Sequence, residues 1–230
     1  FEEKYNIPFI VGYGMTETSP LVSLSVLTSS MKDLTMDERI EIRALQGLVM
    51  PGLDIRVVNE EGEVPWDGKT MGELTVKGPW IASEYYKDER TEEAFKNGWL
   101  YTGDIAIMTE DGYLKLMDRT KDLIKSGGEW ISSVDLENAL MTHESVYEAA
   151  VVAVPHEKWM ERPLACVVLN EGVTEDDSKK EELRDYLKGQ FASWWVPDEV
   201  LFVKEIPKTS VGKFLKAALR VQLREQYSVN

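Results

Sequence analysis

The feature that most constrains the fold of this sequence is a change of residue pattern near position 119. Between residues 47 and 117, short runs such as 54–58 and 72–78 alternate apolar and polar side chains and are separated by turn residues. Alternation with a period of two is typical of strands that bury only one face. This region therefore predicts an antiparallel sheet or a small barrel.

One pair of runs in this region predicts a hairpin. Residues 104–108 and 113–117 flank a short polar segment, Glu110-Asp111-Gly112, which is typical of a tight turn. Residues 88–97, between two predicted strands, have the composition of a short helix.

After residue 119, longer helical patterns alternate with apolar runs. Ser132, followed by an acid at Asp135, is a typical helix N-cap. The predicted elements are a helix from Ser132, strands at 149–154 (ended by Pro155) and 164–169, a helix at 176–190, a strand at 200–203 and a helix at 214–226. This order predicts a compact α+β domain, and we place the domains at 1–118 and 119–230.

The first residues of the chain have a different pattern. Residues 7–11 are apolar and predict a short buried strand, parallel to its neighbours in an α/β sheet. Residues 31–46 are charged with loosely helical apolar spacing and predict a helix.

Composition excludes some classes of function. The formal net charge of −15 argues against nucleic acid or an anionic membrane as the main partner, because both require a basic surface. The same acidic excess fits a solvated surface, a salt-rich habitat or a hot one. No apolar stretch approaches the roughly 20 residues that span a bilayer.

The cysteine and histidine content argues against a zinc site. The single cysteine, Cys166, lies in an apolar run and is predicted to be a buried core residue, which fits a reducing cytoplasm. With His143 and His156 as the two histidines, no zinc-site spacing is present.

The first motif with chemical content is Tyr13-Gly14-Met15-Thr16-Glu17. An aromatic ring between glycines can lie flat against a purine base, and a threonine hydroxyl can donate to a phosphate oxygen. A glutamate just past a tight turn can bind Mg²⁺, which prefers carboxylate oxygen. The alternative is an ordinary helix start capped by Thr16.

The second motif is Tyr101-Thr102-Gly103-Asp104, with Arg119 at the far end of the predicted hairpin. A carboxylate is a natural acceptor for two ribose hydroxyls, and the hairpin brings Asp104 and Arg119 to one edge. An ordinary turn is the alternative for the Thr-Gly-Asp segment. Asp118 is expected to support the turn.

Two lysine-containing segments follow. Lys125-Ser126-Gly127-Gly128, followed by Trp130, allows close approach of another group, or is simply a turn with a packed tryptophan. Pro207-Lys208-Thr209-Ser210-Val211-Gly212-Lys213 precedes the last predicted helix, and Gly212 leaves room beside the ammonium of Lys213. We interpret Lys208 as a surface residue.

Together, and in this order, these segments resemble the adenylate-forming superfamily, which includes acyl-CoA synthetases, luciferases and peptide-synthetase adenylation domains. The resemblance covers nearly the whole chain. It implies mixed α/β and α+β architecture: the end of a large N-terminal domain, with a short α/β segment and an antiparallel sheet or barrel, followed by a small α+β lid domain.

The resemblance also implies residue roles. In the superfamily, the residues corresponding to Tyr13, Gly14, Met15 and Thr16 contact the nucleotide, with the tyrosine on adenine and the threonine on the α-phosphate. The glutamate at Glu17 binds magnesium, and Asp104 and Arg119 contact the ribose. Lys213 orients the acyl carboxylate and stabilises charge during adenylation, so Lys213, Thr16 and Glu17 are the predicted catalytic residues.

Further roles concern the second half-reaction. Lys121 corresponds to the hinge about which the small domain rotates, although a plain surface lysine is the alternative. Lys125, Gly127, Gly128 and Trp130 correspond to the region that binds coenzyme A. Residues 128–137 resemble most closely the branch of medium- to long-chain fatty acyl-CoA ligases.

The resemblance implies ATP with Mg²⁺, a carboxylic acid and coenzyme A as substrates. It implies a cytoplasmic location and leaves a homodimer open.

The superfamily's Ser/Thr/Gly-rich phosphate loop lies upstream of the tyrosine motif, and nothing like it occurs here. We therefore expect this chain to form the lid and one wall of a site. An acyl-AMP ligase serving a carrier protein, and a non-catalytic binding module, are the alternatives.

Overall fold

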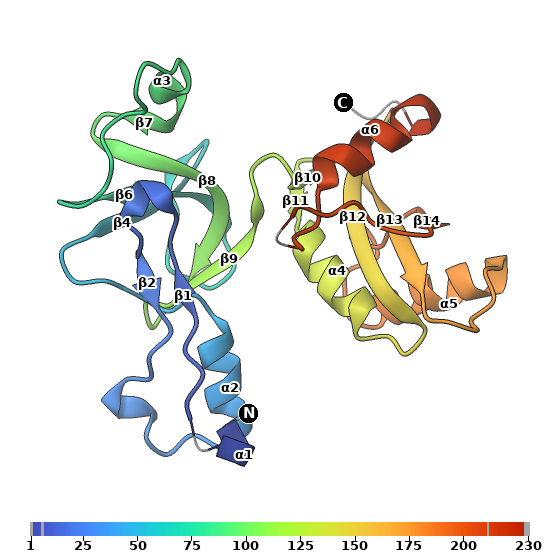
Figure 1. The fold of residues 1–230 in the computed structure, drawn as a ribbon, viewed down its shortest axis with the longest axis horizontal. Coiled ribbons are helices and arrows are strands. Elements are labelled where there is room, and N and C mark those ends of the chain that lie inside the picture. The colour runs from blue at the N-terminus through green and yellow to red at the C-terminus, as the bar shows by residue number, and fades with distance from the viewer. Residues whose placement is uncertain (1, 6, 211, 228–230) are drawn as a thin grey trace. The chain divides into compact units, whose positions relative to one another are not determined.

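The computed structural model describes residues 2–5, 7–210 and 212–227, and the chain divides into two compact units, Phe1–Thr120 and Lys121–Asn230 (Figure 1). The division lies two residues after the boundary placed from the sequence. Within the described ranges, no helix has both the length and the hydropathy of a membrane span.

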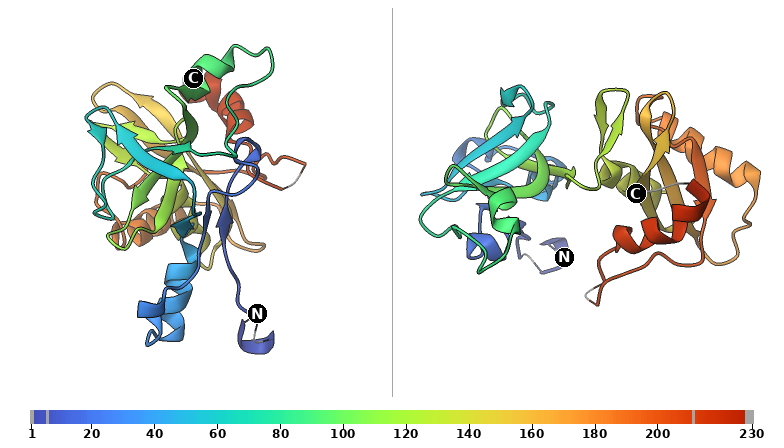
Figure 2. Two further views of the ribbon diagram at one scale, coloured as in Figure 1. Left: turned by 90° about the vertical axis from the view of Figure 1, so that its left-hand side faces the viewer. Right: turned by 90° about the horizontal axis from the view of Figure 1, so that it is seen from above.

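The first unit is built on a six-stranded antiparallel sheet with the order β5-β4-β6-β8-β7, in which β9 also pairs with β8. Its strands are β4 (Asp54–Asn59), β5 (Gly62–Glu63), β6 (Gly72–Lys77), β7 (Phe95–Lys96), β8 (Trp99–Met108) and β9 (Leu114–Arg119). The sheet curves strongly, like part of a barrel (Figure 2). The predicted antiparallel sheet and the hairpin at 104–117 are confirmed.

A smaller antiparallel sheet lies at the start of this unit. It has the order β1-β2-β3 and consists of β1 (Gly12–Tyr13), β2 (Ser23–Leu24) and β3 (Leu48–Val49). Buried side chains of the two sheets form one core: Tyr13, Val22, Val57, Val64, Leu74, Val76, Ala106, Met108 and Leu114. Through Tyr13, this core reaches the first sequence motif.

The remaining elements of the unit are short helices: α1 (Glu2–Tyr5), η1 (Thr16–Thr18), η2 (Ser29–Met31), α2 (Met36–Ala44) and α3 (Arg90–Ala94). The predicted helix at 31–46 begins only at Met36, because Thr35 caps it. Thr35 Oγ1 accepts the Glu38 N–H at 3.4 Å, and the Thr35 N–H in turn donates to Glu38 Oε2 at 2.8 Å. The predicted helix at 88–97 ends early because its last residues join the sheet as β7.

The prediction of a buried parallel strand at residues 7–11 is wrong. This segment forms no strand, and Ile7, Phe9 and Ile10 are about half exposed or more (54%, 67% and 49%). A continuous apolar run is typical of a strand covered on both faces. No strand among the described residues pairs with this segment, so its sequence alone does not make it a strand here.

The second unit is a five-stranded sheet with helices on both faces. The sheet has the order β11-β10-β13-β12, with β14 parallel to β13. Its elements are β10 (Ile124–Ser126), β11 (Glu129–Ile131), α4 (Ser133–Met141), β12 (Val146–His156), β13 (Met160–Leu169), α5 (Asp177–Lys188), β14 (Glu199–Phe202) and α6 (Lys216–Tyr227). The predicted α+β order is confirmed, and the hairpin β10–β11 is an addition to it.

Two details of this unit bear on the predictions. Ser132 caps α4 as expected, because its Oγ accepts the Asp135 N–H at 3.1 Å. The strand β12, however, continues through Pro155 to His156 instead of ending before it. β12 lies at the edge of the sheet, where a missing N–H donor costs no ladder hydrogen bond.

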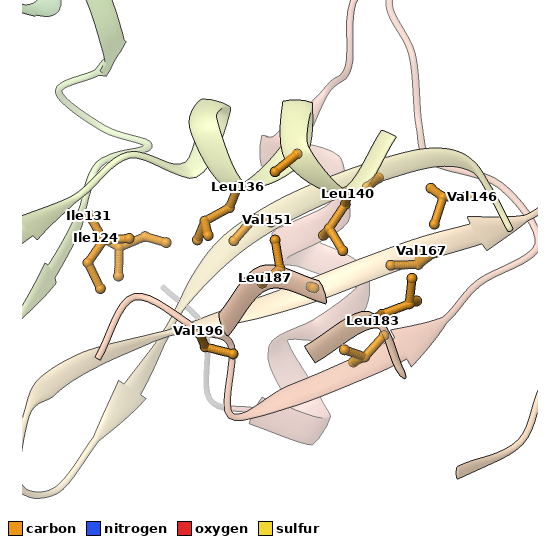
Figure 3. Packing of buried hydrophobic residues seen from close by; sticks show 14 residues of the cluster. Ile124, Ile131, Leu136, Leu140, Val146, Val151, Val167, Leu183, Leu187 and Val196 are labelled. Atoms are coloured by element: carbon orange, nitrogen blue, oxygen red, sulfur yellow. The ribbon is translucent and has the colours of Figure 1, made fainter. Parts of the chain in front are cut away.

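The core of the second unit has two layers. On one face of the sheet, α4 and α5 contribute Leu136, Leu140, Leu183 and Leu187 to a cluster with the strands (Figure 3). On the other face, Leu219 and Leu223 of α6 pack against the strand layer that holds Cys166. α6 is thereby fixed to the sheet directly after the segment that carries Lys213.

Cys166 supplies a probe of this packing. It is fully buried, and burial raises the pKa of its thiol to about 12. Because the thiolate is the reactive form, we expect a disulfide reagent to modify Cys166 more slowly in the native protein than in urea by at least about a thousandfold. Absorbance of the released thiolate measures both rates; rapid stoichiometric labelling of the native protein would contradict the buried position.

Candidate functional site

Three of the predicted nucleotide-binding residues meet in the first unit. Asp104 of β8 and Arg119 of β9 lie opposite each other in the antiparallel register, and Arg119 Nε lies 3.2 Å from Asp104 Oδ1. The hydroxyl of Tyr13, 91 residues away in sequence, donates to Asp104 Oδ2 at 2.6 Å. The expectation that the hairpin brings Asp104 and Arg119 together is confirmed, and the contact with Tyr13 is new.

The three side chains differ in exposure. Tyr13 and Asp104 are buried, whereas the Arg119 side chain is 59% exposed. Burial, and next to it the charge of Asp104, raises the pKa of the Tyr13 phenol far above its ordinary value. Tyr13 therefore keeps its proton at neutral pH and acts as the donor in this pair.

The backbone before Asp104 is held by a local network. Thr102 Oγ1 donates to Leu74 O at 2.8 Å and accepts the Asp104 N–H at 3.1 Å. Glu73 Oε1 accepts the Gly103 N–H at 3.1 Å, and Gly103 adopts φ +71°. A glycine suits this conformation, which turns its N–H towards Glu73.

Glu73 is a residue that the sequence prediction missed. Burial raises the pKa of its carboxyl, although the Gly103 N–H acts in the opposite direction. It lines a pocket of about 310 Å³ together with Tyr85, Thr102, Gly103 and Thr120, among others. The signal for Glu73 in sequence is weak, because a glutamate in an alternating strand ordinarily faces solvent.

The turn after Tyr13 shows why Gly14 is required. A Cβ on Gly14 would lie 1.7 Å from Pro20 O, so the close approach is to the chain itself. Thr16 is not the cap of the following η1 turn: Met15 occupies that position, and Thr18 Oγ1 donates to Met15 O at 2.9 Å. The alternative interpretation of Thr16 as an ordinary cap is therefore wrong, and the Thr16 side chain is exposed.

Glu17 has a partner that was not foreseen. Tyr85 donates its hydroxyl to Glu17 Oε1 at 2.7 Å across 68 residues of sequence, and this bond raises the pKa of Tyr85 to about 12. Tyr85 is itself held by the edge of the Phe95 ring and by Thr91. No signal in the sequence connects Tyr85 with Glu17.

The oxygen ligands around Glu17 fit a magnesium ion that is shared with a bound phosphate. Among the described residues, no group of three His, Cys, Asp or Glu side chains could form a metal cage. Mg²⁺ usually takes one or two carboxylates and completes its shell with phosphate oxygens and water. Glu17, with Oε1 fixed by Tyr85, suits such a shared site and not a site made of protein alone.

In the second unit, the Gly127–Gly128 segment is the turn of the β10–β11 hairpin. Both glycines have positive φ (+62° and +90°), as a two-residue hairpin turn requires. A Cβ on Gly127 would lie 2.8 Å from the indole of Trp159, whose carbonyl accepts the Gly127 N–H. Trp159 is a further neighbour that the sequence prediction missed.

The other predicted residues of this hairpin lie around the turn. Lys125 and Trp130 are opposite each other in the register. Lys125 is exposed, and its backbone N–H donates to Glu161 Oε2 at 2.8 Å; Trp130 is partly buried. The hairpin therefore presents a lysine and an indole on one face of the two strands.

Lys121 begins the second unit and is exposed. Its carbonyl accepts a hydrogen bond from Arg220 Nη2 of α6 at 3.1 Å, and the same nitrogen lies 2.5 Å from Asp122 Oδ1. The side chains of Arg220 and Asp122 are largely buried (14% and 13% exposed). α6 thus holds the backbone at the start of the unit.

Lys213 lies in a tight turn before α6. Thr209 N donates to Lys213 O at 2.8 Å, and Gly212 N donates to Thr209 O at 2.9 Å. Lys213 is exposed, and within the described residues its ammonium makes no hydrogen bond or ion pair. Lys208, by contrast, forms an ion pair with Glu148. Val211 of the same motif lies outside the described residues.

These observations can be compared with known proteins. Residues 1–86 match the family described as AMP-binding enzyme, and residues 135–213 match the AMP-binding enzyme C-terminal domain. This chain belongs to the adenylate-forming, AMP-binding enzyme family. Tyr13, Glu17 and Lys213 lie within the matched segments, whereas Asp104 and Arg119 lie between them.

Two of the relatives that this chain matches are fatty-acid–CoA ligases. It is 51% identical over 229 residues to the long-chain-fatty-acid–CoA ligase of Thermus thermophilus, covering 98% of this chain and 42% of the relative. It is 38% identical over 221 residues to the medium-chain-fatty-acid–CoA ligase of Ectopseudomonas oleovorans, covering 96% and 40%.

A solved structure agrees in fold. The ATP-bound MatB of Rhodopseudomonas palustris superimposes with a TM-score of 0.81 at 30% identity, covering 98% of this chain and 42% of that one. The chain therefore spans about 40% of the length of the relatives named here (40–42%).

Proposed function

We propose that the protein carrying this chain is an ATP-dependent acyl-CoA ligase acting on a medium- or long-chain fatty acid. The observation that carries the proposal is the meeting of Tyr13, Asp104 and Arg119 at one edge of the first unit, in a chain half identical to a long-chain-fatty-acid–CoA ligase. We place the protein in the cytoplasm and leave a homodimer open.

In the first half-reaction, a carboxylate oxygen attacks the α-phosphorus of ATP, and the bond to pyrophosphate breaks. In this proposal, Asp104 accepts from the ribose hydroxyls, Arg119 lies beside it, and Gly14 and Met15 border the nucleotide. Thr16 donates to the α-phosphate, and Lys213 stabilises the charge that develops on carboxylate and phosphate. Magnesium held by Glu17 would neutralise phosphate charge.

In the second half-reaction, the thiol of coenzyme A attacks the acyl carbon, and the bond to AMP breaks. We assign coenzyme A to the hairpin residues Lys125, Gly127, Gly128 and Trp130. The exposed Lys121 is proposed as the hinge between the two half-reactions. Two glycines at the turn leave space for a narrow pantetheine chain.

The test is a product analysis. The full-length protein is incubated with a fatty acid, ATP, Mg²⁺ and either coenzyme A or an acyl carrier protein, and pyrophosphate and thioester are quantified by chromatography. Pyrophosphate with acyl-CoA supports the proposal. Pyrophosphate with acyl-carrier protein alone would indicate a ligase serving a carrier, and the absence of both products would indicate a binding module.

A further inference from the structure

We propose that the hydroxyl of Tyr13 orients the Asp104 carboxylate and thereby sets the preference of the site for ribose over deoxyribose. Tyr13 is in this view a positioning residue that acts through Asp104. The inference rests on the proposed use of ATP, and it concerns which sugar the site accepts.

The geometry shows how Asp104 is held. Tyr13 donates to Oδ2 at 2.6 Å, and Arg119 approaches Oδ1 at 3.2 Å. A carboxylate has about four lone-pair positions, so each oxygen retains capacity for one further donor. With both oxygens engaged, the plane of the carboxylate is fixed, and the remaining lone pairs point in defined directions.

The two partners do not hold Asp104 equally well. The Arg119 side chain is mostly exposed, so solvent screens its charge and its long side chain is only weakly held at Asp104. Tyr13 is 9% exposed and belongs to the hydrophobic core that includes Val22 and Leu74. Its hydroxyl is therefore the more rigid of the two supports.

The hydroxyl of Tyr13 makes a charge-assisted hydrogen bond to Asp104. Burial, together with the charge of Asp104, raises the pKa of this phenol, so the hydroxyl donates throughout the neutral range.

The orientation of Asp104 affects the preference for ribose, because the two ribose hydroxyls are the donors to its carboxylate. The 2′- and 3′-hydroxyls of ribose can each donate to one carboxylate oxygen, but only if the carboxylate is in the correct rotamer. A nucleotide without one hydroxyl keeps only the other of these two bonds and therefore gains less from a well-placed Asp104. Loosening Asp104 should therefore weaken binding of ATP more than binding of a deoxy analogue.

The experiment uses the full-length protein with Tyr13→Phe, which keeps the ring and removes the hydroxyl. KM is measured for ATP, 2′-deoxyATP and 3′-deoxyATP by pyrophosphate release. We expect the unmodified protein to prefer ATP by roughly tenfold or more, the scale of one hydrogen bond to a charged group. In Tyr13→Phe this ratio should fall several-fold, with KM for ATP changing most.

Two controls separate positioning from general destabilisation. Tyr113 is another buried tyrosine of this unit, and its hydroxyl donates to Val26 O at 2.7 Å. Tyr113→Phe removes a similar bond away from Asp104 and should leave the ratio unchanged. In an Asp104→Ala background, which removes the carboxylate that Tyr13 orients, Tyr13→Phe should produce no further change in the ratio.

The outcomes are distinguishable. If the unmodified protein releases no pyrophosphate or accepts all three nucleotides equally, the proposed function or the ribose role of Asp104 fails. If it discriminates and Tyr13→Phe discriminates just as well, or loses all nucleotides in equal proportion, the positioning role of Tyr13 is overturned.

Discussion

Replacing Lys213 with alanine in the full-length protein should lower the rate of acyl-adenylate formation by roughly two to three orders of magnitude, the scale of removing one transition-state contact. The structure favours a chemical cause for this loss over a structural one. The ammonium is exposed and makes no hydrogen bond or ion pair within the described residues, while the turn is closed by backbone bonds.

The measurement separates the half-reactions. Pyrophosphate release reports adenylation, and thioester formed from supplied acyl-AMP reports the second step, which should change far less. Lys208→Ala is the matched control, because Lys208 lies in the same segment but is paired with Glu148. Equal loss in both half-reactions, or an equal effect of Lys208→Ala, would contradict the role assigned to Lys213.

Replacing Arg162 with alanine should have the largest effect on stability, lowering the free energy of unfolding by about 2–4 kcal/mol, chiefly through the loss of its hydrogen bonds. Arg162 is 7% exposed, and its guanidinium donates to both Asp198 oxygens, to Ser126 Oγ and to the carbonyls of Trp194 and Val196. It thus joins strand β10 of the hairpin to the segment before β14. Its removal takes the donor away from the buried Ser126 Oγ and Val196 O, whereas water can still reach the half-exposed Asp198 carboxylate.

Urea denaturation followed by tryptophan fluorescence measures this effect. Lys188→Ala is the control, since Lys188 and Asp185 form an exposed pair whose loss should cost at most about 0.5 kcal/mol. Arg162→Lys should not restore stability, because the three N–H groups of an ammonium cannot replace a guanidinium that donates to five acceptor oxygens. A loss below about 1 kcal/mol for Arg162→Ala would contradict the structural role.

The effect of Arg162→Ala should also depend on pH. Arg162 lowers the pKa of Asp198, so this pair stabilises the protein above the ordinary carboxyl value of about 4 and loses its contribution as the pH falls further. The difference in stability between Arg162→Ala and the unmodified protein should therefore be constant from about pH 5 to 7. Below about pH 4 it should decrease.

Local predictions from the sequence held where neighbours in sequence are also neighbours in space. Asp104 and Arg119 converge because one tight turn joins two alternating strands, and Ser132 caps α4 through an N–H three residues away. The strand predicted at residues 7–11 failed, because burial depends on what covers a segment and not on its own composition.

The contacts of Tyr13 with Asp104 and of Tyr85 with Glu17 join residues 91 and 68 positions apart. No periodicity or spacing in the sequence indicates them, since such pairs form only when distant segments of the chain fold against each other. Glu73 and Trp159 were missed for the same reason, because each contacts a glycine in a segment distant from it in the sequence.

By itself, the sequence determined the family, the order of helices and strands in the second unit, and which residue types carry the chemistry. These properties follow from patterns of polarity and turn residues among neighbours in the sequence, which do not depend on contacts with distant segments. Only the tertiary structure decided which partner holds each functional side chain, because directed hydrogen bonds such as that of Tyr13 require atoms from distant segments to lie within about 3 Å of each other.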